Sequence, residues 1–177
     1  MSVTKANADV LDLTDAYAFS GTVSGTSKIV QVVYTQSTAN TTGTTLTPLD
    51  TSIPQNNEGT ELLTLAITPT NTSNILRIDI DVKVGRDASS GWVTQALHQD
   101  STAAAISSRS IYGNSVNEVS AGTAWTYFME AGTVSETTFK LRAGPNNSQT
   151  IRMNGDAGTN YLTGNQPSTI TVTEIAV

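Results

Sequence analysis

The clearest pattern in the chain is a strict alternation of apolar and polar residues over positions 76–84. Apolar side chains occupy the even positions, and Arg77, Asp79, Asp81 and Lys83 occupy the odd ones. Successive side chains of a β-strand point to opposite faces of the sheet. The pattern therefore predicts a strand with one buried face and one polar face.

Similar short runs, separated by turn-forming clusters, extend along the chain as far as Val177. The expected strands are residues 28–35, 41–47, 60–68, 74–84, 91–99, 103–112, 124–131, 136–143, 149–153 and 168–177. Residues 94–106 come closest to a helical period, but the Ser101-Thr102 pair favours a turn there. The sequence thus predicts an all-β fold, an antiparallel jelly-roll-like sandwich of about eight to ten short strands. The expected core is Leu63, Leu65, Ile67, Leu76, Ile78, Ile80, Val82, Phe139 and Leu141.

Residues 1–27 differ from the rest of the chain. They hold a short apolar patch, in which Leu11, Leu13, Tyr17 and Phe19 are the largest side chains, followed by the glycine-broken run 21–25. A patch of this size is too small to form a core of its own. We therefore expect two parts: an extended N-terminal attachment arm, residues 1–27, and a β domain, residues 28–177.

Composition narrows the classes of function. The net charge is −6 and the nine basic residues are scattered, whereas nucleic-acid binding needs clustered Lys and Arg. No apolar run approaches the roughly 20 residues of a membrane-spanning helix, so membrane insertion is not expected. The chain has no cysteine and shows no apolar core of signal-peptide length near its start. It is therefore expected to be made in the cytoplasm and not to rely on disulfides.

Candidate catalytic residues are few. His98 is the only histidine, and no nucleophile-elbow motif accompanies any of the serines, so a structural or exposed histidine is expected. Asp79 and Asp81 share a strand face as a glycosidase carboxylate pair would. Because Arg77 and Lys83 flank them on that face, a neutralising charge ladder is the favoured interpretation. The sequence thus predicts no enzyme, no catalytic residue and no cofactor.

Two further features bear on binding. Residues 154–160 place oxygen-bearing side chains at alternate positions but lack the carboxylates of a calcium loop, so a long turn and no metal site are expected. Trp92 and Trp125 are candidate stacking platforms for sugars, and burial within a sheet is the alternative for each. Trp125 shares its strand face with Tyr127 and Met129, which favours burial. Burial is also the favoured interpretation for Trp92, but its position after Ser89-Ser90-Gly91 at a strand start makes it the stronger stacking candidate of the two.

The segments 28–35, 51–59, 65–70 and 73–78 together resemble a pattern seen in many small bacteriophage tail-fibre and virion-appendage proteins. Residues 10–25 are also similar to leader segments of phage fibre proteins. The resemblance covers roughly residues 8–84. It implies a jelly-roll-like domain that assembles as a trimeric knob, of the general tumour-necrosis-factor-like kind, on the outside of a virion. It carries no catalytic residue.

These observations predict a structural virion protein. We expect a homotrimer, because Val30, Val32 and Tyr34 face one way on their strand while Ile29 and Val33 face the other, so that a neighbour must cover one set. The arm residues would attach the protein to a tail, collar or capsid component. A host cell-surface glycan would be bound by the polar connections 87–92, 113–123 and 154–166, with Trp92, Tyr112 and Tyr161 as aromatic contacts.

Other interpretations stay open at this stage. A head-decoration or collar protein would have the same fold, with the capsid as its main partner. A monomeric carbohydrate-binding module is a third possibility, and glycan binding at Trp92 would favour it. A polysaccharide depolymerase is the rival from the enzymes, but such enzymes usually need long β-helical bodies and paired carboxylates in a groove.

Overall fold

The computed structural model describes residues 28–87, 90–113, 121–156 and 158–177. Within these ranges the chain forms twelve strands and one short 3-10 helix, η2 (Tyr161–Gly164). The long strands are β1 (Ile29–Ser37), β3 (Thr60–Ile67), β4 (Ile75–Arg86), β5 (Gly91–Gln99), β6 (Ser107–Gly113), β7 (Ala121–Glu130), β8 (Thr137–Pro145) and β12 (Ser168–Ile175). The short strands are β2 (Thr41–Gly43), β9 (Ile151–Met153), β10 (Gly155–Asp156) and β11 (Thr159–Asn160).

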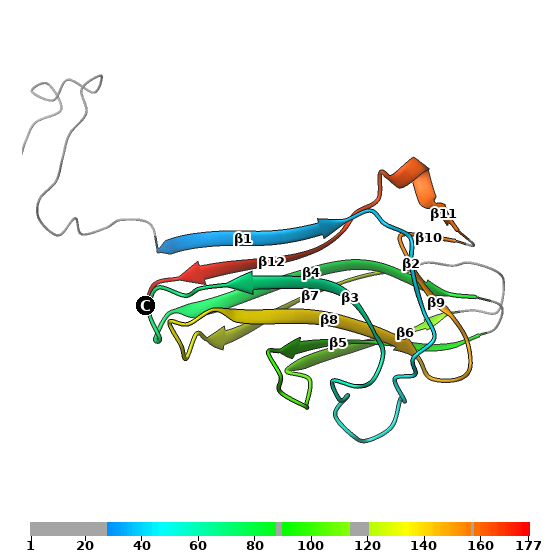
Figure 1. Cartoon of the computed structure of the whole chain (residues 1–177), viewed down its shortest axis with the longest axis horizontal. Helices are drawn as coiled ribbons and strands as arrows, with labels where there is room; N and C mark the ends of the chain where they lie inside the picture. The colour runs from blue at the N-terminus through cyan, green and yellow to red at the C-terminus, as the bar shows by residue number, and fades with distance from the viewer. Residues whose placement is uncertain (1–27, 88–89, 114–120, 157) are drawn as a thin grey trace, which may run out of the picture.

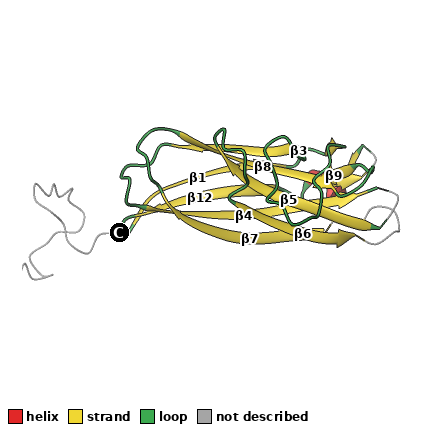
Figure 2. Cartoon of the chain, turned by 90° about the horizontal axis from the view of Figure 1, so that it is seen from below, coloured by secondary structure: helices red, strands yellow, loops and turns green. Residues whose placement is uncertain are grey.

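The eight long strands form two antiparallel sheets that face each other (Figures 1 and 2). The first sheet has the order β1-β12-β4-β7, and the second has the order β3-β8-β5-β6. When the long strands are numbered in chain order, these orders become 1-8-3-6 and 2-7-4-5. That interleaving is the jelly roll, in which two Greek keys are wound together. The prediction of an antiparallel jelly-roll-like sandwich is confirmed.

The core lies between the two sheets, where the alternation along each strand placed it. All nine predicted core residues are buried, and Leu76, Ile78, Phe139 and Leu141 are completely inaccessible to solvent. Trp125 belongs to the same core, and its indole Nε1 donates a hydrogen bond of 3.1 Å to Ser107 Oγ. Burying the ring while satisfying its N–H removes Trp125 as a sugar-stacking surface.

One predicted strand and one predicted turn needed correction. The strand expected at 41–47 ends at Gly43, because the chain then leaves the first sheet and Thr47 N donates a hydrogen bond to Pro145 O of β8. Residues 154–166, expected to be a long turn, contain the small β10–β11 hairpin and η2. In the described parts of the chain, no helix has the length and apolarity that crossing a membrane requires.

Candidate functional site

The polar connections predicted to contact a ligand leave the sandwich at one end. Gly91 pairs with Gly113, so the β4–β5 and β6–β7 connections start side by side. Ala121 pairs with Val84 near the end of β4, and β12 begins at this end after the 154–166 segment. We call this the loop end; it lies on the right in Figure 1. At the opposite end, which we call the arm end, residues 1–27 join the domain, and Ala176 N donates to Lys28 O.

Trp92 and Tyr112 lie next to each other at the loop end. They are cross-strand partners on β5 and β6, their ring centroids are 5.3 Å apart, and their planes meet at 70°. Trp92 is 37% exposed and Tyr112 is 53% exposed. An edge-to-face aromatic pair of this kind fixes both rings while leaving part of each surface open to solvent. The structure therefore brings together two of the three predicted aromatic contacts.

The β8–β9 turn holds the backbone of Trp92 in place. Asn146 Oδ1 accepts a hydrogen bond of 3.0 Å from Trp92 N, and Asn146 N donates one of 3.1 Å to Trp92 O. The same Asn146 Oδ1 lies 3.4 Å from a guanidinium nitrogen of Arg86, and Asn147 Oδ1 accepts from the other terminal nitrogen. Trp92 is thus connected through Asn146 to a side chain that comes from the facing sheet.

Arg86 extends from β4 across the loop end between the two sheets and is only 4% exposed. A Cβ atom added at Gly91 would lie 1.7 Å from Arg86 Nη1, and one at Gly113 would lie 3.3 Å from Arg86 Cγ. The paired glycines therefore make room for the arginine. Burial lowers the pKa of the Arg86 guanidinium, and the nearby Asp87 carboxylate partly offsets this effect. The sequence interpretation missed this residue, although Arg86 has the same even parity as the buried residues of β4.

A depression of about 440 Å³ lies beside the same turn. It is lined by Thr44, Leu46, Asp87, Ser148, Gln149 and Thr150. Its volume falls within the usual range for small-molecule sites. The loop end therefore has two features. It exposes aromatic rings, and the turn that supports Trp92 borders a depression rich in hydroxyl and amide groups.

The third predicted aromatic contact is separate from the pair. Tyr161 opens η2 and is partly buried, and its backbone N donates to Asn154 O. The β10–β11 hairpin and η2 lie over the ends of β1 and β12, on the opposite side of the loop end from β5 and β6 (Figure 1). Tyr161 thus shares the end but not the surface of the aromatic pair. The predicted attachment residues Leu11, Leu13, Tyr17 and Phe19 lie outside the described residues.

His98 is a buried side chain, 1% exposed, on the outward face of β5. Neither ring nitrogen has a hydrogen-bond partner in the described part of the chain, and the Asp100 carboxylate accepts from Thr137 and Thr138 instead. Burial lowers the pKa of His98, the charge of Arg142 lowers it further, and Glu58 raises it. His98 therefore has neither the serine nor the carboxylate contact that a catalytic triad requires.

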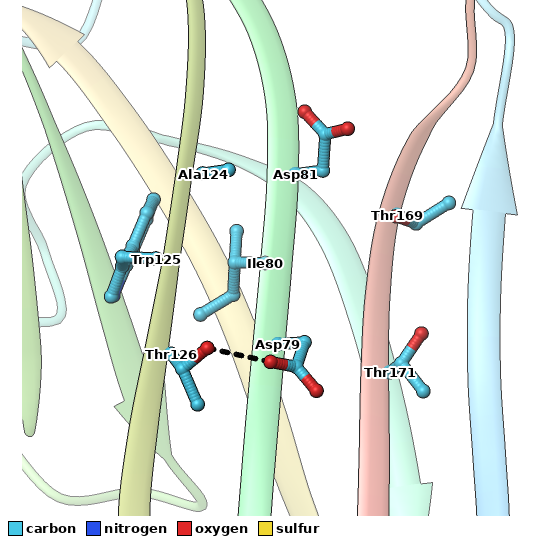
Figure 3. Close-up of a pocket in the computed structure, with 8 residues that line it drawn as sticks. All are labelled: Asp79, Ile80, Asp81, Ala124, Trp125, Thr126, Thr169 and Thr171. Carbon is cyan, nitrogen blue, oxygen red and sulfur yellow. Dashed lines mark hydrogen bonds between the residues drawn. The ribbon is translucent and has the colours of Figure 1, made fainter.

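Asp79 and Asp81 lie on the open outer face of the first sheet, where they line a shallow depression of about 300 Å³ (Figure 3). Arg77 Nε lies 3.0 Å from Asp79 Oδ2, and Thr126 Oγ1 donates a hydrogen bond of 2.6 Å to Asp79 Oδ1. The expected charge ladder is thus formed at its Arg77–Asp79 step. Within the described ranges, neither Asp81 nor Lys83 forms an ion pair.

Asn154, the first residue of the calcium-loop candidate, has a structural role. It is buried with a φ of 62°, its Nδ2 donates 2.8 Å to Ser37 O, and its Oδ1 accepts 2.7 Å from Ser168 Oγ. Its oxygen is therefore occupied in joining β1, β9 and β12. Among the residues that the structure describes, His, Cys, Asp and Glu side chains do not gather in groups of three or more suited to a metal ion.

Comparisons with known proteins add little to this picture. No protein-family model matches the chain, and no curated protein matches it. Among solved structures, similar ones include dimeric latent PorU from Porphyromonas gingivalis, with 10% identity, a TM-score of 0.48, and coverage of 90% of this chain and 14% of the PorU chain. Another is the VP2 subviral particle of infectious bursal disease virus, with 9% identity, a TM-score of 0.36, and coverage of 83% of this chain and 38% of the VP2 chain. Both scores lie below 0.5, too low to inform the function of this chain.

Proposed function

We propose that this protein is a non-enzymatic structural protein of a bacteriophage virion, a homotrimeric fibre or spike knob. Its N-terminal arm, residues 1–27, attaches it to another virion protein, and its loop end contacts the host surface. The observation that carries the proposal is that the two ends of the domain differ. The described chain begins with Lys28 at one end of the sandwich, and the exposed Trp92–Tyr112 pair and the strand ends that flank the three polar connections lie at the other.

The chemistry of the loop end favours a glycan as the host ligand. Aromatic rings held at an exposed surface stack on the apolar faces of sugar rings, and hydroxyl and amide groups bond to sugar hydroxyls. Trp92 and Tyr112 supply the rings, while Ser148, Gln149 and Thr150 line the neighbouring depression. The two rings lie near the ends of β5 and β6, and the depression is lined mainly by the neighbouring connections, so the site combines a rigid β scaffold with loops.

Binding to a printed array of bacterial surface glycans tests the recognition step. Trp92→Ala and Tyr112→Ala should each abolish binding of the purified protein to the glycans that the unaltered protein selects. Val134→Ala is the matched control, since Val134 is 55% exposed but lies in the β7–β8 connection at the arm end. Unchanged binding by both aromatic variants would contradict the assignment of this surface.

Labelling of the parent particle with an antibody to the β domain tests the location. The proposal expects label at the tip of a tail fibre or spike. Label distributed over the head would instead support the second candidate, a head-decoration or collar protein. Glycan binding by a protein of monomeric mass would support a carbohydrate-binding module, the candidate that the Trp92–Tyr112 pair also favours.

A further inference from the structure

The outer face of the first sheet has exposed apolar side chains on both edges, three on β1 and one, Phe128, on β7, which we call the β1 patch and the β7 patch. On β1, Val30, Val32 and Tyr34 are 42%, 53% and 68% exposed, and on β7 Phe128 is 57% exposed. Each of these strands pairs with a described strand on one side only. Large apolar side chains on an unpaired edge are unusual for a protein that works as a monomer.

The β1 edge lacks two of the usual protections against association, although a β-bulge lies at its start, between Ile29 and Gln31. Residues 29–37 contain no charged residue and no proline, the two devices that most often keep an edge strand from pairing. The neighbouring column on β12, Thr169, Thr171 and Thr173, is also uncharged. The charged residues of this face, by contrast, are concentrated on β4, and Arg77 and Asp79 pair within the subunit. Depletion of charge is typical of the core of a protein interface.

The two patches lie at the same height on the sheet. Val32 pairs with Thr173, Thr173 with Arg77, and Arg77 with Phe128, so that all four share one row. In the next row Tyr34 is connected in the same way, through Thr171 and Asp79, to Thr126. Rotation about an axis parallel to the strands moves no residue along that axis. Patches at equal height can therefore meet in a closed ring, whereas patches at different heights would generate an open helix.

We propose that the occupant of each patch is a second copy of this chain: the β1 patch of one subunit packs against the Phe128 edge of β7 in the next. The proposal rests on the homotrimer proposed above and assigns its interface. In such a ring the threonines of β12 and the depression lined by Asp79, Asp81 and Thr126 face the threefold axis (Figure 3). All arms then leave at one end of the axis, and all loop ends lie at the other.

Cysteine crosslinking tests this contact directly, because the chain has no cysteine of its own. Three interstrand steps separate residues 32 and 128 within one subunit, about 14 Å, which is too far for an intramolecular disulfide. The Val32→Cys/Phe128→Cys variant should therefore form covalent trimers on oxidation, seen by non-reducing electrophoresis. Each single variant should stay uncrosslinked, because identical positions do not meet in a head-to-tail ring.

Light scattering on single charge substitutions provides an independent readout. Val32→Asp and Phe128→Asp should each raise the dissociation constant of the trimer by roughly 30-fold or more, as loss of a central interface contact does. Ala66→Asp is the control, an exposed position on the edge strand β3 of the other sheet, and should leave the mass unchanged. Circular dichroism checks that each variant retains its strands.

The outcomes separate the two proposals. An unaltered protein with the 18.6 kDa mass of one chain would overturn the proposed trimer and this interface together. A trimer that forms no crosslink in the double variant would overturn the interface alone. Crosslinked dimers from Val32→Cys by itself would also overturn it, since they would indicate two-fold pairing of β1 with β1.

Discussion

The two ends of the sandwich each bury one charged side chain, and the two charges are supported very differently. At the arm end, the Glu174 carboxylate is inaccessible to solvent and accepts four hydrogen bonds from neutral donors. The distances are 2.6 Å from Gln31 Nε2, 2.6 Å from Asn74 Nδ2, and 2.8 Å from both Thr70 N and Thr70 Oγ1. At the loop end, Arg86 contacts two asparagine oxygens, and its Nε has no partner among the described residues.

This difference indicates which end is built to be rigid. The donors to Glu174 come from β1 and from the β3–β4 connection, so one carboxylate joins three parts of the chain where the arm begins. A buried network in which each oxygen is satisfied rigidifies its surroundings. The Arg86 partners both come from the β8–β9 turn, and no carboxylate forms an ion pair with Arg86 in the described part of the chain. The loop end is therefore held less firmly, which is compatible with the recognition role proposed for it.

The largest expected effect is on Glu174. Burial by itself raises the pKa of this carboxyl, but the hydrogen bonds from Gln31, Asn74 and Thr70 outweigh burial and lower the pKa to about 2. Glu174→Gln replaces one carboxylate oxygen, which accepts hydrogen bonds, with an NH2 group that would face hydrogen-bond donors. The substitution should lower the free energy of unfolding by about 3 kcal/mol. Urea denaturation measures the change. Glu130→Gln, on the exposed end of β7, is the control and should change it by less than about 0.5 kcal/mol.

The same carboxylate should give the fold a pH dependence. Its folded pKa of about 2 lies below the ordinary value of 4.5, so its contribution is fully present above about pH 4.5 and is lost as pH falls towards 2. The difference in unfolding free energy between the unaltered protein and Glu174→Gln, about 3 kcal/mol at pH 6, should shrink over that window. A difference that stays constant down to pH 2.5 would contradict the assignment.

At the loop end, Gly91→Ala should cost about 2 kcal/mol, because the added Cβ would overlap the buried Arg86 guanidinium. In an Arg86→Ala background the same substitution should cost at least about 1 kcal/mol less, since the nearest obstacle is removed and Asn146 Oδ1, 2.9 Å from the added Cβ, remains. Thermal unfolding of the four proteins in this cycle measures the coupling. Additive effects of the two substitutions would show that the glycine is required for a different reason.

The smallest expected effect on stability is that of Arg86→Met, about 1 kcal/mol. The substitution removes a buried cation that lacks a carboxylate partner. It also removes the donor to Asn147 Oδ1, while Asn146 Oδ1 keeps its hydrogen bond from Trp92 N. Because Asn146 also holds Trp92, the near-ultraviolet circular dichroism of the Trp92–Tyr112 pair should weaken. A loss of 3 kcal/mol or more would contradict the contrast between the two ends.

Much of the fold was predictable because alternation is a local property. The parity of residues 76–84 placed each side chain of β4 correctly, and the same rule applied to Arg86 and Glu174 would have identified both buried charges. The interpretation stopped at apolar residues and so missed them. The partners of these charges were beyond prediction, since Asn146 is 60 residues from Arg86 and Gln31 is 143 residues from Glu174.

Local alternation was sufficient to predict most of the long strands and their buried faces, because these depend on neighbours two residues apart. The tertiary structure fixed which strands pair, and through pairing which loops share an end. It also decided that Tyr112 lies beside Trp92 while Tyr161 does not, and that Val32 and Phe128 share a row. Strand order depends on contacts between distant segments, and hydrophobic burial is non-directional, so the same alternation is compatible with many sheet topologies.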